Sequence, residues 1–341
     1  MNTQSHIPLI PPGRRLWRRN PPLALTGGVM LIALALMIPA IWLDPRIVNG
    51  EAVWIKPAKF ALSIALYSFT LLWILNFVQG SPRVQKIARA AGWVIALMFL
   101  IEVIAIFGQA ARGRSSHFNN ATIVDGVIFN VMGAAITILF VMHLAISYVL
   151  LRPADGERVL ASGLRTGMLV AALGMAVGYL MVSPSAEQIA VLAEGRTPQK
   201  IGGHAVGAPD GGPGIPLSGW SATAGDLRVA HFFGMHAMQL LPLFALWLRR
   251  WPSGNSDRKR AYVRIAAGVY AGITILLTVQ ALRGESIAQT GAETFGAFAA
   301  LIALGMLAAW RAAARHGREA KLLQQSEASP FRDGGAPGVH V

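Results

Sequence analysis

Two histidines, an arginine and a glutamine follow one another closely at the start of the sixth apolar segment of the chain. Arg228, His231, His236 and Gln239 fall within an arc of roughly 140° on a helical wheel of about 100° per residue. Ionisable side chains in apolar segments are costly to bury and usually face a cavity or a partner. The stripe predicts either a ligand, metal or haem site or a network of hydrogen bonds between helices.

His231 and His236 are the candidate metal ligands of this stripe. The chain has no cysteine, so a bound cofactor would be haem or a divalent metal held by imidazole and carboxylate. Five positions separate the two histidines, so a shared metal ion would need ligands from other helices. The external loops could bring in His117 or His204. Further candidates for cofactor binding are the polar residues of the third and sixth segments: Arg228, Gln239, Gln109 and Arg112.

Glu102, His117 and Asp125 are the candidate catalytic residues. Glu102 lies in the third apolar segment, two turns before Gln109 and on the same face. A carboxyl group buried there is either half of an ion pair between helices or a proton donor and acceptor. Arg112, Arg228 and Lys59 are the candidate cations for such a pair.

His117 lies in a polar loop, Ser115-Ser-His-Phe-Asn-Asn120, and Asp125 follows at the start of the fourth segment. A histidine in a loop is most often simply solvated. Arg112, Arg114 and Asp125 flank His117 near the membrane surface, and such a cluster also suits an anionic ligand. His143 lies about 27 Å further along the fourth helix. It is predicted to be structural, with a haem ligand or proton exit as the alternative.

Eight apolar segments are long enough to span a bilayer as helices, which needs about 20 residues. They are predicted at 23–43, 60–79, 92–109, 123–149, 166–183, 229–248, 262–282 and 292–310. The segments do not alternate in polarity as the strands of a membrane barrel do. The sequence predicts an all-α integral membrane bundle of eight helices.

Basic residues alternate with these segments. Twenty-one of the 30 Lys and Arg residues lie in 14–19, 83–89, 152–165, 249–264 and 311–332, and the other connections are close to neutral. Basic connections stay on the cytoplasmic side of a membrane. We therefore predict a bacterial inner-membrane protein with both termini in the cytoplasm. The net charge of +14 is explained by topology and does not indicate nucleic-acid binding.

The predicted units follow from the same pattern. They are a basic N-terminus (1–22), a first four-helix half (23–151), a cytoplasmic linker (152–165), a second half (166–310) and a largely disordered cytoplasmic tail (311–341). The second half contains a long external loop, 184–228, whose Gly and Pro content excludes long regular elements. The loop is expected to be an ordered cover, a lid or a disordered segment.

The two halves share a short motif. Gln109-Ala-Ala-Arg-Gly-Arg-Ser115 ends the third segment, and Gln280-Ala-Leu-Arg-Gly-Glu-Ser286 ends the seventh, at an offset of 171 residues. Lys59-Phe60 and His231-Phe232 match at an offset of 172. Nearly equal offsets favour duplication of a four-helix unit over chance similarity, with both halves in parallel orientation. The repeat adds Gln280, Arg283 and Glu293 to the candidate site.

Two long motifs resemble a pattern in uncharacterised bacterial multi-pass membrane proteins. They are Ser116-His-Phe-Asn119 after Leu100-Ile-Glu102, and Asp226-Leu-Arg-x-x-His231-Phe-x-Gly-x-His236-x-x-Gln239 after Gly207–Gly214. This resemblance covers most of the chain and implies no activity. The eight-span layout is also similar to that of haem A synthases. That family carries a histidine pair in each half, whereas the second, third, seventh and eighth segments here contain no histidine.

Three classes of function remain. The first is a membrane-embedded enzyme or redox protein that uses the histidines for haem or metal. The second is a transporter for a small polar or anionic solute, and the third is a non-catalytic sensor or assembly protein. Each class predicts a small-molecule or partner site that faces the extracytoplasmic side. No phosphate-binding loop, Gly-x-Ser-x-Gly or His-Glu-x-x-His motif is present, which argues against soluble nucleotide-driven chemistry.

Overall fold

The chain folds into a bundle of long helices. The computed structural model describes residues 17–151, 158–252 and 254–327, and describes side chains up to residue 315. The first group of helices is α2 (Pro21–Leu43), α3 (Ile55–Leu75), α4 (Pro82–Ala111) and α5 (Ile123–Leu150). The second group is α6 (Arg158–Met181), α8 (Leu227–Met235), α9 (Ala237–Arg250), α10 (Ser256–Leu282) and α11 (Ala292–Glu327).

The connections at one end of the bundle hold all the remaining elements of the described chain. They are β1 (Ile47–Val48), β2 (Glu51–Ala52), α7 (Ala186–Ala193), β3 (Ala205–Val206), β4 (Gly225–Asp226) and a 3-10 turn at Ile287–Gln289. Strands β1 and β2 pair antiparallel, as do β3 and β4. The prediction of an all-α bundle is therefore confirmed, and the sheet content is limited to two short hairpins.

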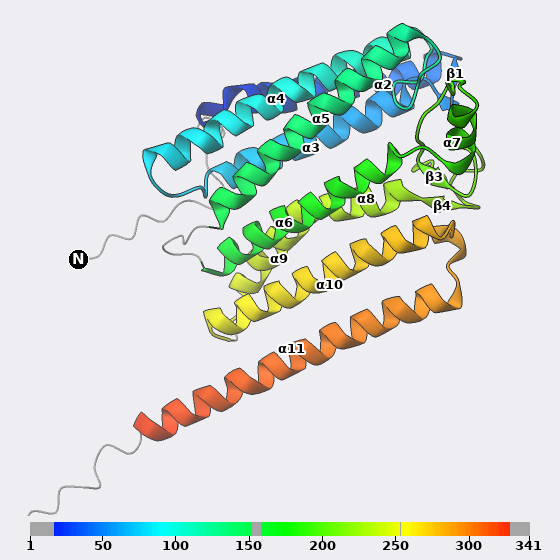
Figure 1. Cartoon of the computed structure of the whole chain (residues 1–341). Coiled ribbons are helices and arrows are strands. Elements are labelled where there is room, and N and C mark those ends of the chain that lie inside the picture. The colour runs from blue at the N-terminus through cyan, green and yellow to red at the C-terminus, as the bar shows by residue number, and fades with distance from the viewer. Residues whose placement is uncertain (1–16, 152–157, 253, 328–341) are drawn as a thin grey trace, which may run out of the picture.

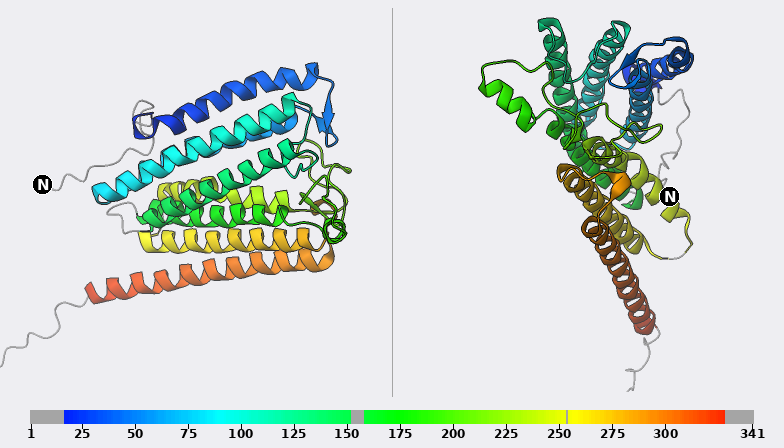
Figure 2. Two further views of the ribbon diagram at one scale, coloured as in Figure 1. Left: turned by 45° about the horizontal axis from the view of Figure 1, so that its top comes forward. Right: turned by 90° about the vertical axis from the view of Figure 1, so that its right-hand side faces the viewer.

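The two groups of helices lie side by side (Figure 1). In the first group α2 packs on α3 and α4, and α4 packs on α5; in the second, α6 packs on α8, α9 and α10, and α10 packs on α11. The groups meet mainly where α5 contacts α6. In the view along the helix axes, the helices of the first group spread apart at one edge of the bundle, and α11 lies at the opposite edge (Figure 2).

The outer surface of the bundle is apolar. Large side chains such as Leu36 (64%), Trp42 (86%), Phe295 (69%) and Trp310 (67%) are exposed on α2 and α11. Within the described residues, seven helices are long and apolar enough to cross a membrane, and the bent pair of α8 and α9 would make an eighth. These features are compatible with a lipid bilayer and are those expected of a membrane protein.

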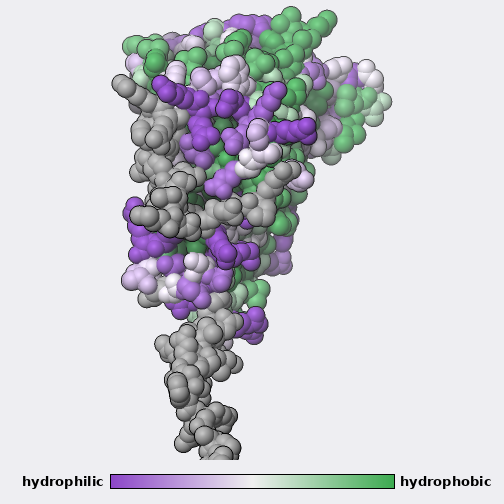
Figure 3. Space-filling model, turned by 90° about the vertical axis from the view of Figure 1, so that its left-hand side faces the viewer, coloured by the Kyte–Doolittle hydropathy of each residue, from purple (hydrophilic) through white to green (hydrophobic). Residues whose placement is uncertain are grey.

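Hydrophilic side chains gather at the end of the bundle opposite the hairpins (Figure 3). This end holds the start of α2, the connections between α3 and α4 and between α9 and α10, and the final turns of α11. Basic residues occur at these helix ends, for example Arg83, Lys86, Arg250 and Arg258. The segregation of basic residues predicted from the sequence is therefore present in the fold.

Glycines on α6 bring the backbones of the second group close together. A Cβ atom on Gly174 would lie 2.4 Å from the backbone nitrogen of Met235, and one on Gly167 would lie 2.8 Å from the carbonyl oxygen of Ala237. A Cβ atom on Gly163 would lie 2.7 Å from that of Ala245. Small residues have this packing role in membrane helices generally, as expected from the glycine content.

Several helices extend beyond the predicted apolar segments. Helix α3 begins at Ile55, before the segment predicted at 60–79, and α6 begins at Arg158, so residues 158–165 of the predicted linker are helical. Helix α11 continues to Glu327, so the first half of the predicted disordered tail is helical. Hydropathy could not locate these helix ends because they contain charged residues. The remainder of the tail, 328–341, and the linker residues 152–157 lie outside the described residues.

The sixth predicted segment is not one continuous helix. Helices α8 and α9 meet at His236 with a bend of 41°. A single helical wheel through Arg228 and Gln239 is therefore only approximate, because α8 and α9 do not share one axis.

The shared Gln-Ala-x-Arg-Gly-x-Ser motif has the same local structure at the ends of α4 and α10. Gln109 and Gln280 each donate from Nε2 to the carbonyl oxygen of the serine that closes the motif, at 3.4 and 3.3 Å. The motif glycines, Gly113 and Gly284, have φ values of +66° and +74°, which favour glycine. The two helix ends are thus equivalent in hydrogen bonding as well as in sequence.

Candidate functional site: a cavity between the two groups of helices

A cavity of about 1210 Å³ lies between the two groups of helices. Its walls come from α3, α4 and α5 on one side and from α6, α8 and α9 on the other. The long connection between α6 and α8 covers the end near the hairpins, contributing His204, Asp210 and residues 214–221. Six predicted site residues line this cavity: Glu102, His117, Arg228, His231, His236 and Gln239.

Glu102 is the most unusual residue of the wall. Its side chain is only 1% exposed, and neither carboxylate oxygen has a hydrogen-bond partner. Most buried polar groups in proteins are hydrogen bonded, and a buried carboxyl group without a donor is costly. The nearby charge that acts on Glu102 is Lys56 in the first turn of α3. None of the predicted cations, Arg112, Arg228 or Lys59, pairs with it.

His231 presents one ring nitrogen for binding. Its Nδ1 lies 2.8 Å from the carbonyl oxygen of Gly174. A carbonyl oxygen only accepts, so Nδ1 carries the hydrogen and Nε2 of the neutral ring is an acceptor. The close approach of α6 and α8 at Gly174 and Gly234 brings this carbonyl within reach. This hydrogen bond fixes the orientation and the tautomer of the His231 ring, as similar bonds do for histidines that bind metals or act as bases.

Two further histidines come from connections at the covered end. His204 bonds through Nδ1 to Asp210 Oδ2 at 3.1 Å, and His117 bonds through Nδ1 to Ser116 Oγ at 3.0 Å. Phe118 lies between them, with ring centroids 4.9 Å from His204 and 6.0 Å from His117. Both histidines line the cavity.

These groups form one cluster. Lys56 interacts electrostatically with Glu102, His117 and His204, and His204 interacts with His117 and His231. We call the five residues Lys56, Glu102, His117, His204 and His231 the polar cluster. It combines a cation, a carboxyl group and three imidazoles, which suits ligand binding and proton exchange.

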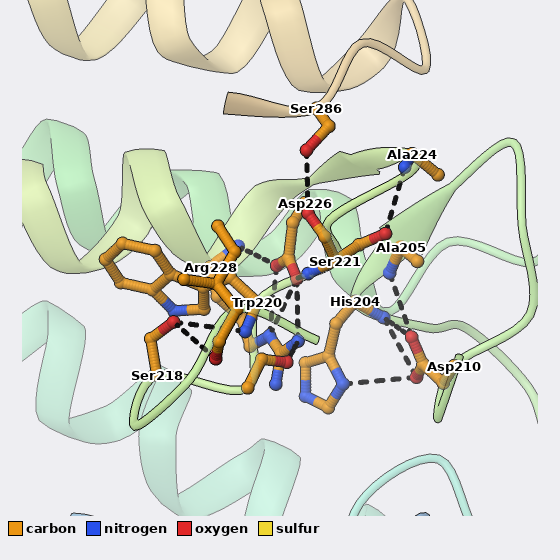
Figure 4. Close-up of polar contacts among 12 residues, drawn as sticks. His204, Ala205, Asp210, Ser218, Trp220, Ser221, Ala224, Asp226, Arg228 and Ser286 are labelled. Atoms are coloured by element: carbon orange, nitrogen blue, oxygen red, sulfur yellow. Dashed lines mark hydrogen bonds and ion pairs between the residues drawn. The ribbon is translucent and has the colours of Figure 1, made fainter. Parts of the chain in front are cut away.

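Ion pairs hold the cover at this end of the bundle, and Figure 4 shows the pair of Arg228 and Asp226. Arg228 pairs with Asp226, with Nη2 2.6 Å from Oδ2, and also donates to the carbonyl oxygen of Gly219. On α3, Lys59 donates to Glu51 at 3.0 Å and to the carbonyl oxygen of Ser218. Arg228 and Lys59 therefore hold the cover, and of the cations on α3 and α8 Lys56 is left to face the cavity.

Asp125, Gln109 and Arg112 form a different network, and they do not line the cavity. The fully buried Asp125 accepts from Gln109 at 2.8 Å, from Thr122 at 2.7 Å and from Arg114 at 2.6 Å. Arg112 completes the network at 3.4 Å. Its hydrogen bonds join the end of α4 to the start of α5. The structure does not bring these three predicted site residues to the cavity, and their polar atoms join two helices.

The repeat residues Gln280, Arg283 and Glu293 also lie away from the cavity. Gln280 Nε2 donates to Thr290 Oγ1 at 2.9 Å, and Arg283 pairs with Glu293 at 2.8 Å. They join the end of α10 to the start of α11, as Gln109 and Arg112 join α4 to α5. The structure does not bring these three residues to the cavity.

His143 and Gln239 link the two groups of helices. His143 is fully buried, with Nδ1 2.8 Å from the Tyr67 hydroxyl and Nε2 2.9 Å from the carbonyl oxygen of Met168. Both ring nitrogens have hydrogen-bond partners within the bundle, as expected of a structural histidine. Gln239 donates to Thr70 Oγ1 at 3.1 Å, and its Oε1 is buried without a partner.

The described residues contain no group of three or more His, Asp or Glu side chains placed to hold a metal ion. His231 lies within α8 and His236 lies at the break between α8 and α9, where it is exposed. Both line the cavity, but the described residues supply no third ligand beside them. His231 remains available as a single imidazole ligand.

Burial lowers the pKa of His117 well below its ordinary value, and Lys56 and His204 lower it further. Burial also lowers the pKa of His204, although its hydrogen bond to Asp210 opposes the shift. The pKa of Asp210 lies well below its ordinary range; burial opposes this, but the hydrogen bond from His204 prevails. At neutral pH the cluster thus contains neutral imidazoles beside an ionised Asp210.

These shifts predict an acid-sensitive cover. A histidine with a lowered pKa stabilises the closed fold above the ordinary histidine pKa of about 6.5, and this contribution is lost as the pH falls below it. Amide hydrogen exchange in residues 201–226, corrected for intrinsic rates, is expected to be faster at pH 5 than at pH 7.5. His204→Asn should weaken this pH dependence, and an unchanged dependence would contradict the assignment.

Sequence reasoning did not place Lys56 in the site, because a lysine at the start of an apolar helix usually reaches the lipid headgroups. His204 was expected only as a residue that the external loop could bring to the histidines of the sixth segment. It lies in a Gly- and Pro-rich connection, where no periodicity indicates the direction of a side chain.

Comparisons of this chain with models of protein families, with curated protein sequences and with solved structures gave no match.

Proposed function

We propose that this protein binds a small ligand in the cavity and exchanges protons with it through the polar cluster. The observation that carries the proposal is Glu102, a buried carboxyl group that lines the cavity and has no hydrogen-bond partner. Structural carboxyl groups in this chain look different, since Asp125 and Asp226 each accept several hydrogen bonds. A group left without donors is poised for a ligand that supplies them.

The chemistry follows from the groups present. His231 offers Nε2 as an acceptor, Glu102 offers two carboxylate oxygens, and Lys56 offers a cation. A ligand group that binds among them can lose a proton to imidazole or carboxylate while the ammonium group stabilises the resulting negative charge. We infer a membrane-embedded enzyme or binding protein with acid–base chemistry. A haem or metal at His231 would need further ligands from outside the described groups.

The proposal predicts that the purified protein retains a ligand. Native mass spectrometry of the full chain should detect an added mass. Leaving a buried hydrogen-bonding group of the ligand without its partner costs about 1–3 kcal/mol. The affinity for the ligand in Glu102→Gln should therefore fall by roughly tenfold or more, and the retained mass should fall with it. An absorption spectrum and elemental analysis of the same sample identify a haem or a metal if either is the retained group.

Glu293→Gln is the matched control, because Glu293 is a surface carboxyl outside the cavity, paired with Arg283. This variant should retain the ligand as the unaltered chain does. Absence of any added mass, or equal loss in both variants, would contradict the proposed function.

We also propose that the bundle has eight spans arranged as two fused four-helix halves. The support is the matching pattern of helix contacts in the two groups and the equivalent helix ends at Gln109 and Gln280. The cavity would then lie between the halves, as binding sites do in transporters built from repeats. This arrangement favours transport of a polar solute as a second candidate function. Uptake of the retained ligand into proteoliposomes tests it.

We propose the bacterial inner membrane as the location, with both termini in the cytoplasm and the cover of the cavity outside. Because the chain lacks cysteine, single cysteines report the side of each connection. An impermeant thiol reagent should label Glu194→Cys in intact cells and should label Asp257→Cys only after lysis. The reverse pattern would overturn this orientation.

A further inference from the structure

We propose that the ligand is an amphiphile with a hydroxyl-bearing head group and an apolar tail, and that it enters from the bilayer between α5 and α6. This inference rests on the proposed function and specifies the class of its ligand. It follows from three properties of the cavity: its division into a polar and an apolar part, the hydrogen-bonding character of the polar part, and its opening at the lipid-facing surface.

The cavity is polar at the covered end and largely apolar beyond it. Along α3 it extends from Lys56 to Tyr67, a distance of about 16 Å at the helical rise. The walls beyond the polar cluster are aromatic, aliphatic and methionine side chains: Phe99, Met132, Leu139, Phe140, Met175 and Met238. Methionine and aromatic surfaces adapt to flexible apolar groups. Gln239 adds an amide at the deep end.

The polar part offers several acceptors without a partner. With Nδ1 bonded to carbonyl or carboxylate oxygens, His231 and His204 have Nε2 left as an acceptor in the neutral ring. Glu102 adds two unpartnered oxygens. Arg228 and Lys59 bond to the cover, so Lys56 is the cation of α3 and α8 that remains to act as a donor. A head group that donates hydrogen bonds, such as a hydroxyl, satisfies these acceptors; a purely anionic group does not.

The cavity meets the outer surface between α5 and α6. Ile136, Ile138, Tyr179 and Val182 line the cavity and are also 36%, 43%, 37% and 43% exposed. The Tyr179 hydroxyl donates to Thr137 Oγ1 at 3.2 Å, which links the two helices across this opening. An apolar tail can therefore lie in the cavity and extend into lipid without crossing the polar cover.

Gly133 provides a way to close the opening. It lies on α5 in the cavity wall, and no heavy atom lies within 4 Å of a Cβ atom built there. Gly133→Phe should fill the passage without disturbing the helix, because phenylalanine has a higher helix propensity than glycine. Gly268→Phe is the matched control, because Gly268 on α10 has the same open surroundings and lies outside the cavity wall.

The probe is hexadecan-1-ol with a diazirine in its tail, added to the full chain in vesicles of phosphatidylethanolamine and phosphatidylglycerol. Photolysis should attach it to cavity residues on α5, α6 and α9. Excess hexadecan-1-ol should compete, and hexadecane should not. Gly133→Phe and Glu102→Gln should each lower the cavity labelling by about tenfold, the change that 1.4 kcal/mol of lost binding gives. Gly268→Phe should leave it unchanged.

Labelling confined to the outer faces of α2 and α11 would overturn the inference, as would equal competition by hexadecane. Equal labelling in the Gly133→Phe and Gly268→Phe variants would overturn the lateral entry. The proposed function can survive these results. A water-soluble molecule retained in a Glu102-dependent manner, without cavity labelling by the alcohol, refutes the amphiphile alone. Absence of both refutes the inference and the proposed function together.

Discussion

Replacing Gly174 by leucine is expected to separate α6 from α8 and to abolish the folded second group of helices. A Cβ atom at this position would lie 2.4 Å from the nitrogen of Met235 and 2.5 Å from the carbonyl carbon of Gly234. Both are backbone atoms, so no side chain can rotate away. Overpacking of a core commonly costs about 1–3 kcal/mol, and we expect the upper end of this range or more.

The measurement is thermal unfolding of the purified variant in detergent, with loss of the monodisperse species as the readout. Gly268→Leu serves as the control, because the space around Gly268 is open. The control should unfold at the temperature of the unaltered chain. A Gly174→Leu variant that does the same would show that the close approach of α6 and α8 is not required for stability.

The helical class could be predicted from the sequence because apolar segments of this length have few alternatives. The two groups of helices are also consistent with the shared Gln-Ala-x-Arg-Gly-x-Ser motif, whose two copies end α4 and α10 in the same way. The helix boundaries were less predictable. Charged first turns, as at Lys56 and Arg158, belong to helices here, although hydropathy places them outside.

Part of the site was predictable for a similar reason. His231 and Glu102 are polar residues inside apolar helices, and such residues usually face a cavity or a partner. The sequence could not separate these two outcomes. Asp125 and Gln109 satisfied each other at 2.8 Å, whereas Glu102 remained without a donor. That difference depends on which helices meet, and local spacing carries no such information.

The helical wheel of the sixth segment was only approximate. Helices α8 and α9 are bent by 41° and share no single axis, although Arg228, His231, His236 and Gln239 all line the cavity. The roles of Lys56 and His204 depend on contacts with distant segments, since Lys56 acts on Glu102 from another helix and His204 is held by Asp210 in the cover. These tertiary relations required the folded structure.

The reactivity of Glu102 is expected to differ from that of Asp125 by at least tenfold. A hydrophobic carbodiimide reaches carboxyl groups through apolar surroundings, and the cavity that Glu102 lines opens to the lipid-facing surface. Glu102 has no donor to shield its oxygens. Asp125 is enclosed by Gln109, Thr122 and two guanidinium groups. A carboxylate held in this way by charged donors is strongly stabilised as the anion.

Mass spectrometry of the labelled full chain, digested after treatment with dicyclohexylcarbodiimide in vesicles, tests the central claim most directly. We predict a single dominant adduct at Glu102, absent in Glu102→Gln, unchanged in Glu293→Gln, and reduced by excess hexadecan-1-ol. An adduct at Asp125 with none at Glu102, or equal labelling of the two carboxyl groups, would contradict the existence of a site at Glu102.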